Sequence, residues 1–166
     1  GNRVQQDGIR SSILELMGSG HEDLHRDITI ARVSGWQQFA LAWPTSDDGA
    51  QYFYIENNVA KTGSRTKFLR QYFEFVRLWA QRIGATSSTG VLQPLGFINT
   101  DGSYVVVVKA SGGETFSVEG LPAGTYGIKY TTETQYDVNP ADVTISAGEP
   151  LQTSIPAAGV ITIYQK

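Results

Sequence analysis

Residues 11–44 read SSILELMGSGHEDLHRDITIARVSGWQQFALAWP, a stretch that predicts two strands with a helix between them. The apolar run SILEL predicts one strand, and the run WQQFALAW, which ends at Trp43, predicts another. A helical pattern lies between them. A strand, a helix and a strand within about thirty residues form a βαβ unit, and such units build parallel sheets. In barrels made of these units the chemistry sits at the carboxyl ends of the strands, where Glu15 and Trp43 lie.

The helix of this unit has a start signal and an amphipathic face. Ser19 is followed three residues later by Glu22, which is the spacing of a capping box. The residues that share the apolar face are Leu24, Ile28 and Ala31. We expect this helix to stop at Ser34 and Gly35, where the sequence becomes turn-like.

The strongest helical pattern is expected over residues 66–83. Between the βαβ unit and this helix, residues 45–50 (TSDDGA) predict a loop, residues 51–57 (QYFYIEN) a strand, and residues 59–65 (VAKTGSR) a second loop. The apolar residues of the long helix recur at three- and four-residue spacing and are Leu69, Tyr72, Phe73, Val76, Trp79 and Ile83. We therefore expect Trp79 in the core or at the contact between the helix and the sandwich, and Gly84 to end the helix as its C′ residue.

The composition changes after the long helix, so a domain boundary is predicted in the linker GATSSTG. The remaining chain, residues 85–166, is rich in short β patterns with glycine and proline turns, which predicts an antiparallel sandwich. Asp101 and Gly102 form a strong turn signal between two of these strands. Tyr126 and Tyr130 alternate on one face, and a core position is favoured for them over an exposed sugar-binding platform.

Composition and charge exclude several classes of protein. The net charge of −3 and the absence of a basic patch argue against nucleic acid as a partner. No apolar run is long enough to cross a membrane, and without cysteine there is neither a disulfide nor a thiolate metal site. His21 and His25 have the i, i+4 spacing of metal ligands but lack the HExxH order, so we expect no metal and no cofactor.

Residues 11–110 resemble the C-terminal part of glycoside hydrolase family 30, whose members are retaining enzymes built on a (β/α)8 barrel. ILELMGSG resembles the seventh barrel strand, and FALAW resembles the eighth. The last barrel helix of the family and its passage into a β-sandwich are similar to YFEFVR followed by AQRIGATSS. The hairpin of that sandwich is similar to FINTDGSYVVVVKA. Leu78 and Trp79 replace the usual proline after FVR, and we expect this change to let the helix continue.

The resemblance implies a fold that is α/β followed by all-β: a partial (β/α) barrel segment over residues 1–84 plus an antiparallel β-sandwich over residues 85–166. It implies that Glu15 occupies the position of the catalytic nucleophile and Trp43 that of a wall of the subsite where the bond is cut. Residues expected to contact a sugar near the rim of the cleft are His21, His25 and Tyr52. Alternatively, Glu15 is an ordinary solvated or salt-bridged carboxylate near a strand end.

Only the last βα units of a barrel can be placed, since a complete one needs about 250 residues. The family's acid/base carboxylate follows the fourth strand, which this sequence lacks, and Gly1–Arg3 resembles a cut point. We therefore expect the C-terminal portion of a secreted or periplasmic retaining β-glycosidase that degrades a polysaccharide. The alternative is a non-catalytic carbohydrate-binding or stabilising sandwich module. Unpaired barrel edges predict either a homo-oligomer or a second chain that supplies the missing half.

Overall fold

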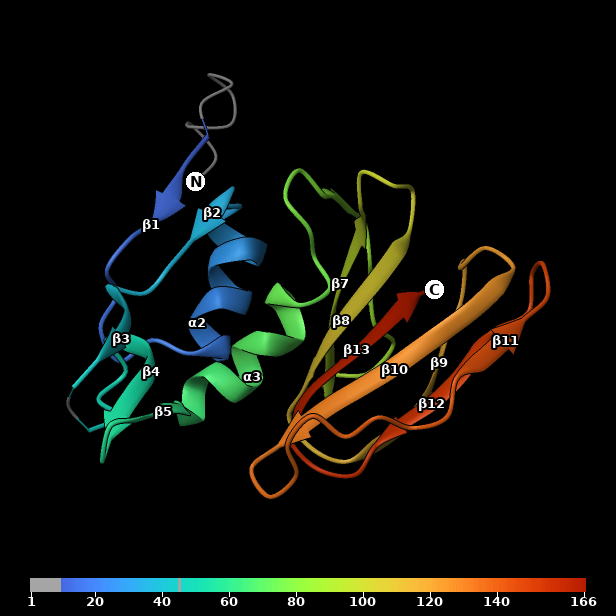
Figure 1. Cartoon of the computed structure of the whole chain (residues 1–166). Helices are drawn as coiled ribbons and strands as arrows, with labels where there is room; N and C mark the ends of the chain where they lie inside the picture. The colour runs from blue at the N-terminus through green and yellow to red at the C-terminus, as the bar shows by residue number, and fades with distance from the viewer. Residues whose placement is uncertain (1–9, 45) are drawn as a thin grey trace. The chain divides into compact units, whose positions relative to one another are not determined.

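The computed structural model describes residues 10–44 and 46–166 and divides into two compact units, the first ending at Leu69 and the second beginning at Arg70 (Figure 1). Among these residues the chain is mostly β, with two short α-helices. None of the described helices is long and apolar enough to cross a membrane. This division precedes the boundary expected near Gly84, and the assignment of residues 1–84 to a barrel end, of which 1–9 lie outside the described residues, stays a prediction.

The first unit contains the predicted βαβ connection. Its strands are β1 (Ser12–Ile13), β2 (Gly35–Trp36), β3 (Ala40–Trp43), β4 (Gln51–Glu56) and β5 (Val59–Thr62). β1 and β2 pair in parallel, which confirms the predicted orientation, and β3 pairs in parallel with β4. The run WQQFALAW is therefore two short strands rather than one. The break follows from Gln38, whose buried side chain donates to the Ser19 carbonyl (3.0 Å) while its backbone N–H donates to the Tyr52 hydroxyl (2.9 Å).

The helix between β1 and β2 begins one residue later than predicted. Helix α2 (His21–Arg26) continues into a π-helical turn, η1 (Asp27–Ala31). Gly20 is the N-cap, and the side chain that bonds back to its N–H is Asp23 (3.2 Å) rather than Glu22. The helical segment ends at Arg32, which is left-handed (φ 52°), before the predicted stop.

A hairpin replaces one of the predicted loops. β4 and β5 are antiparallel and are joined by Asn57 and Asn58, which both have positive φ (52° and 61°). Two consecutive left-handed residues in a two-residue connection form a type I′ turn, for which asparagine is well suited. The prediction of a loop over residues 59–65 was therefore wrong, because β5 and the start of the next helix lie within it.

Helix α3 spans Ser64–Phe73 and is much shorter than predicted. Helical bonds continue only as far as the N–H of Val76, and the next residues form a turn and then β6 (Gln81–Ile83). The cause is Asn99, whose buried side chain donates to the Phe75 carbonyl and accepts from the Arg77 N–H, both at 3.0 Å. These bonds occupy backbone groups that a continuing helix would use. The expectations that Gly84 ends the helix and that Trp79 is in the core were therefore wrong.

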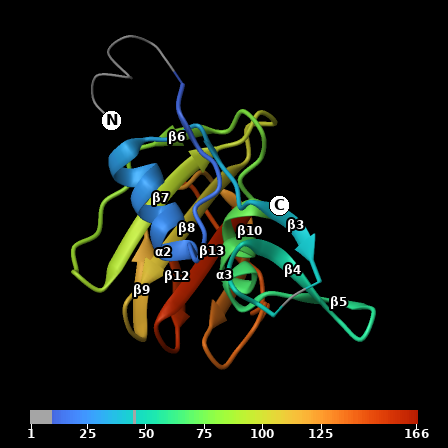
Figure 2. The ribbon, with the colours of Figure 1, turned by 90° about the vertical axis from the view of Figure 1, so that its left-hand side faces the viewer.

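The second unit is an antiparallel β structure. Its other strands are β7 (Leu92–Ile98), β8 (Tyr104–Ala110), β9 (Glu114–Val118), β10 (Gly124–Thr132), β11 (Val143–Ile145), β12 (Leu151–Ile155) and β13 (Gly159–Gln165). A six-stranded sheet has the order β11-β10-β13-β8-β7-β6, and β12 and β9 form a two-stranded sheet (Figures 1 and 2). The β7–β8 hairpin at Asp101–Gly102 is confirmed.

The core of this unit lies between its two sheets. Strand residues of both sheets form one buried cluster that includes Val108, Ile161, Leu151 and Tyr126. Tyr126 is fully buried, and its hydroxyl donates to the Pro122 carbonyl (2.8 Å), so the predicted core position is confirmed. β9 and β10 follow each other in sequence but belong to different sheets, as strands do in a sandwich.

Candidate functional site

Glu15 lies in the connection between β1 and α2. It follows the carboxyl end of β1 by two residues, it is exposed, and its backbone is left-handed (φ 58°). A left-handed conformation is uncommon for a residue other than glycine, asparagine or aspartate. Two backbone hydrogen bonds hold the residues that follow Glu15: the Ser19 N–H donates to the Leu16 carbonyl (3.2 Å) and the Gly18 N–H donates to the Gly49 carbonyl (3.3 Å). The fold therefore presents this carboxylate to solvent at a strand end.

Trp43 is the last residue of β3 and is 49% exposed. It stands beside Tyr54 in the parallel register of β3 and β4. The ring of Phe39 lies 6.3 Å from the Trp43 ring, centroid to centroid, at an angle of 59°, and Phe39 is 56% exposed. The two rings form an exposed aromatic pair. The sequence prediction named Trp43 and not Phe39, which it placed within one continuous strand.

The three other predicted sugar contacts lie in different surroundings. The His21 ring stacks on Phe68 (4.4 Å between centroids) and is partly exposed. His25 is only 4% exposed. Tyr52 accepts a hydrogen bond from Gln38, and burial raises its pKa above the ordinary value despite that bond. His21 and Tyr52 are therefore partly exposed, whereas His25 is buried.

The carboxylates of the loop after β3 bond to the backbone and side chains around them. The Asp47 carboxylate accepts from the N–H and the hydroxyl of Ser64 (2.6 and 2.8 Å), so it caps the start of α3. Asp48 accepts from the Ala50 N–H (2.9 Å) within the loop. Across residues 10–44 and 46–166 no group of three or more His, Cys, Asp or Glu side chains is arranged to hold a metal ion.

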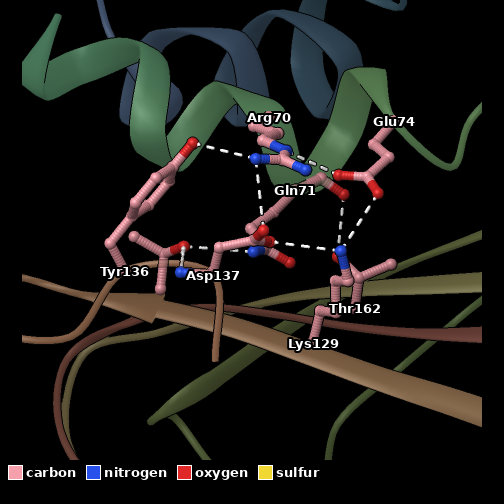
Figure 3. Close-up of polar contacts among 8 residues, drawn as sticks. Arg70, Gln71, Glu74, Lys129, Tyr136, Asp137 and Thr162 are labelled. Carbon is pink, nitrogen blue, oxygen red and sulfur yellow. Dashed lines mark hydrogen bonds and ion pairs between the residues drawn. The ribbon is translucent and has the colours of Figure 1, made fainter. Parts of the chain in front are cut away.

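A charged cluster in the second unit joins the end of α3 to the six-stranded sheet (Figure 3). We call Arg70, Glu74, Lys129 and Asp137 the Arg70 cluster. Glu74 accepts from Arg70 (2.6 Å) and from Lys129 (3.1 Å), and Asp137 lies 3.1 Å from Arg70 and 3.5 Å from Lys129. Beneath these charges, buried Gln71 donates to Thr131 (3.0 Å) and its carbonyl accepts from Thr162 (2.7 Å).

The Arg70 cluster balances its own charge. Partial burial raises the pKa of the Glu74 carboxyl, but the hydrogen bonds from Arg70 and Lys129 outweigh this effect, so its pKa is below the ordinary value. Burial lowers the pKa of the Lys129 amine, and the bond to Glu74 reverses that shift and raises it. Two cations thus neutralise two carboxylates, and the arrangement is one of structural docking rather than of catalysis.

Comparison with known proteins identifies the family. A family model described as "Glycosyl hydrolase family 30 beta sandwich domain" matches residues 80–163, just over half of the chain. No curated protein sequence matches the chain.

Solved structures show the same fold at low identity. A family 30 endoxylanase from Clostridium papyrosolvens superposes with a TM-score of 0.77 at 14% identity, over 100% of this chain and 45% of that one. The catalytic domain of family 30 xylanase C from Talaromyces cellulolyticus gives 0.76 at 18% identity, over 95% and 41%. A conserved exported protein from Bacteroides fragilis gives 0.66 at 16% identity, over 85% and 31%.

The family model and the fold agree on the second unit, and the chain spans less than half the length of these three structures. The predicted resemblance is therefore confirmed, and the chain belongs to glycoside hydrolase family 30 as a C-terminal portion that carries the family's β-sandwich domain.

Proposed function

We propose that this chain is the C-terminal part of a retaining polysaccharide-degrading β-glycosidase, in which Glu15 is the nucleophile. The observation that carries the proposal is the position of Glu15: an exposed carboxylate on a left-handed backbone, two residues after the first strand of a parallel βαβ unit. Strained backbone at the end of a strand is characteristic of functional sites. A retaining enzyme requires such a fixed carboxylate beside the sugar ring that it attacks.

The exposed rings of Phe39 and Trp43 support the same proposal. Sugars have flat C–H faces, and the ring pair formed by Phe39, just before β3, and Trp43, the last residue of β3, provides a surface on which they can stack. We propose Trp43 as a subsite wall, with Phe39 extending it and His21 as a further contact. Tyr52, which is partly exposed, is also proposed as a contact, whereas His25 is left out because it is buried.

The remainder of the site is proposed to come from outside residues 1–166. The acid/base carboxylate and the other barrel strands would be supplied by a preceding segment or by a second, different chain. Secretion is proposed by analogy with the exported Bacteroides relative. The substrate proposed for the first assay is β-1,4-xylan, since two of the similar structures are xylanases.

A mechanism-based label tests the nucleophile without needing the acid partner. In a 2-deoxy-2-fluoro-β-xyloside with a dinitrophenolate leaving group, the carboxylate attacks the anomeric carbon. The bond to the leaving oxygen breaks, and dinitrophenolate departs with the electron pair. Because this leaving group needs no proton, the covalent glycosyl ester should form and persist. We expect mass spectrometry to find one fluoroxylosyl adduct, on Glu15.

The matched control is Glu56, another carboxylate at the end of a strand, which is ion-paired with Lys61. Glu15→Gln should abolish both the label and dinitrophenolate release, whereas Glu56→Gln should leave them unchanged. A folded chain that is not labelled, or that is labelled equally in the Glu15→Gln variant, would show that Glu15 is not the nucleophile of the chain in hand.

A further inference from the structure

Gln38 is a buried polar residue in the short segment between β2 and β3, and it is only 3% exposed. Its side-chain Nε2 donates to the Ser19 carbonyl (3.0 Å), and its backbone N–H donates to the Tyr52 hydroxyl (2.9 Å). A carbonyl oxygen can only accept a hydrogen bond, so the amide nitrogen must face Ser19 and the orientation of the amide is fixed. One residue therefore joins the β1–α2 connection and β4 to the segment that precedes β3.

The bond from Gln38 acts on the connection that carries Glu15. Ser19 is 2% exposed, and its N–H and its hydroxyl both donate to the carbonyl of Leu16, the residue that follows Glu15. Residues 16–19 therefore form a tight turn. Gln38 holds the end of this turn, and so it holds the backbone from which Glu15 projects.

The Glu15 side chain does not fix its own position. It is exposed, and within residues 10–44 and 46–166 it makes no hydrogen bond or ion pair. Its left-handed backbone is of a kind that persists only where the surrounding structure determines it. The connection is also tied by the Gly18 N–H, which donates to the Gly49 carbonyl, but no side-chain substitution removes that bond. The side chain of Gln38 is therefore the part of this support that a substitution can test.

The same side chain holds the segment that carries the exposed aromatic pair. Phe39 directly follows Gln38, and the Ala40 N–H donates to the Ala50 carbonyl (3.0 Å) where β3 begins its parallel pairing with β4. The bond to Ser19 thus joins the backbone that bears the carboxylate to the backbone that bears the ring. A displacement of about 1 Å between groups that act on one substrate changes a reaction rate by about a hundredfold.

We propose that Gln38 is a positioning residue of the proposed site, because its bond to Ser19 sets where Glu15 lies relative to Phe39 and Trp43. Gln38 does not itself contact a sugar. The inference rests on the proposed function, since it needs Glu15 to be the nucleophile. It adds to that function the side chain that fixes the geometry of the attack.

The rate of labelling by the dinitrophenyl fluoroxyloside tests this role. Gln38→Met removes the donor and keeps the length of the side chain. We expect the maximal rate constant for labelling of Glu15 to fall about tenfold. The glycoside concentration that gives half of the maximal rate should change less than about twofold, because the rings remain. A side chain that only stabilised the fold would lower the fraction of protein that is labelled and leave the rate constant of the folded protein unchanged.

Gln51→Met is the matched control. Gln51 is a glutamine of β4 that is 2% exposed and donates to the Ser46 carbonyl (2.8 Å), in the loop after β3 rather than in the connection of Glu15. Its substitution should lower stability by a similar amount and leave the labelling rate constant within about twofold of the wild-type value. Gln38→Asn keeps an amide that is one methylene too short to reach Ser19. It should slow labelling as Gln38→Met does, and it decides the question if the methionine variant does not fold.

The outcomes separate this inference from the proposed function. Labelling of folded Gln38→Met or Gln38→Asn at the wild-type rate would overturn the inference and leave the proposed function intact. Equal slowing in Gln51→Met would also overturn it, because a general loosening of the sheet would then be the cause. A wild-type protein that takes up no label would overturn the proposed function and, with it, the role of Gln38.

Discussion

Trp79 occupies a position of a tight turn where glycine is the favourable residue. The left-handed backbone at φ 67° costs a residue with a side chain about 1–2 kcal/mol, a cost that glycine avoids. Glycine in turn lowers stability by about 0.4–1 kcal/mol, because it increases the conformational entropy of the unfolded chain. We therefore expect Trp79→Gly to raise the free energy of unfolding by roughly 1 kcal/mol. Urea denaturation followed by circular dichroism measures this change.

Leu78→Gly provides the comparison, since it lies in the same turn and lacks positive φ. Glycine relieves no strain there, so the variant should lose about 0.5–1 kcal/mol of stability. A loss of stability in both variants would mean that the Trp79 side chain contributes more to packing than its exposure indicates.

Asn99 illustrates why the end of α3 could not be predicted from the local pattern. Residues 66–83 carry apolar side chains at helical spacing throughout, and within that window no proline or glycine interrupts them. The residue that stops the helix is 24 positions beyond Phe75, on the turn between β7 and β8. A tertiary hydrogen bond therefore overrode local propensity, as it commonly does for helices.

Strands and turns with strong local chemistry could be predicted from sequence. The Asp101–Gly102 turn and its flanking alternation predicted the β7–β8 hairpin correctly. The Asn57–Asn58 turn carried a comparable signal, because asparagine tolerates the left-handed region, and it was overlooked. No local pattern could predict which strands share a sheet, because β9 pairs with β12, which lies beyond β10 and β11 in the sequence.

The Arg70 cluster fixes the last turn of α3 on the six-stranded sheet, and its contribution depends on pH. The folded-state pKa of Glu74 lies below its ordinary value of 4.5, so the unfolded chain binds more protons near that pH. The stabilisation is complete above that value and is lost as the pH falls through the lower, folded-state pKa. We expect Glu74→Gln to cost about 1 kcal/mol at pH 7, because its ion pairs are partly exposed.

Unfolding curves at several pH values measure this effect. The difference between wild type and Glu74→Gln should shrink as the pH is lowered below 4.5. Glu119→Gln, which changes an exposed carboxylate of the same unit, should show neither the loss nor the pH dependence. A Glu74→Gln penalty that stays constant from pH 7 to the acid limit would contradict the electrostatic explanation.

At the scale of the whole molecule, the two units differ in how much apolar surface each one buries. Among the described residues the buried apolar side chains of the first unit are few: Leu24, Ala50, Phe68 and Leu69. The same unit exposes large apolar side chains, among them Leu14, Met17, Ile30 and Leu41. The second unit has a continuous buried cluster between its sheets. Since burial of apolar surface is the main source of stability, the units should differ in stability as well.

Hydrogen exchange followed by mass spectrometry tests this difference directly. β1 and β2 pair over only two residues, whereas β10 and β13 pair over seven. Peptides covering residues 11–17 and 35–43 should therefore exchange by local opening, at least about a hundredfold faster than peptides from β8, β10 and β13. A low concentration of urea should accelerate exchange in the peptides from β8, β10 and β13 and leave exchange in residues 11–17 and 35–43 nearly unchanged, because local opening exposes little new surface.

Equal protection in both sets of peptides would mean that the first unit is already covered, and self-association would then be the explanation to examine by sedimentation. Addition of a preceding barrel segment should slow exchange in residues 11–17 and 35–43 only, because it would pair the exposed strands and cover their apolar side chains.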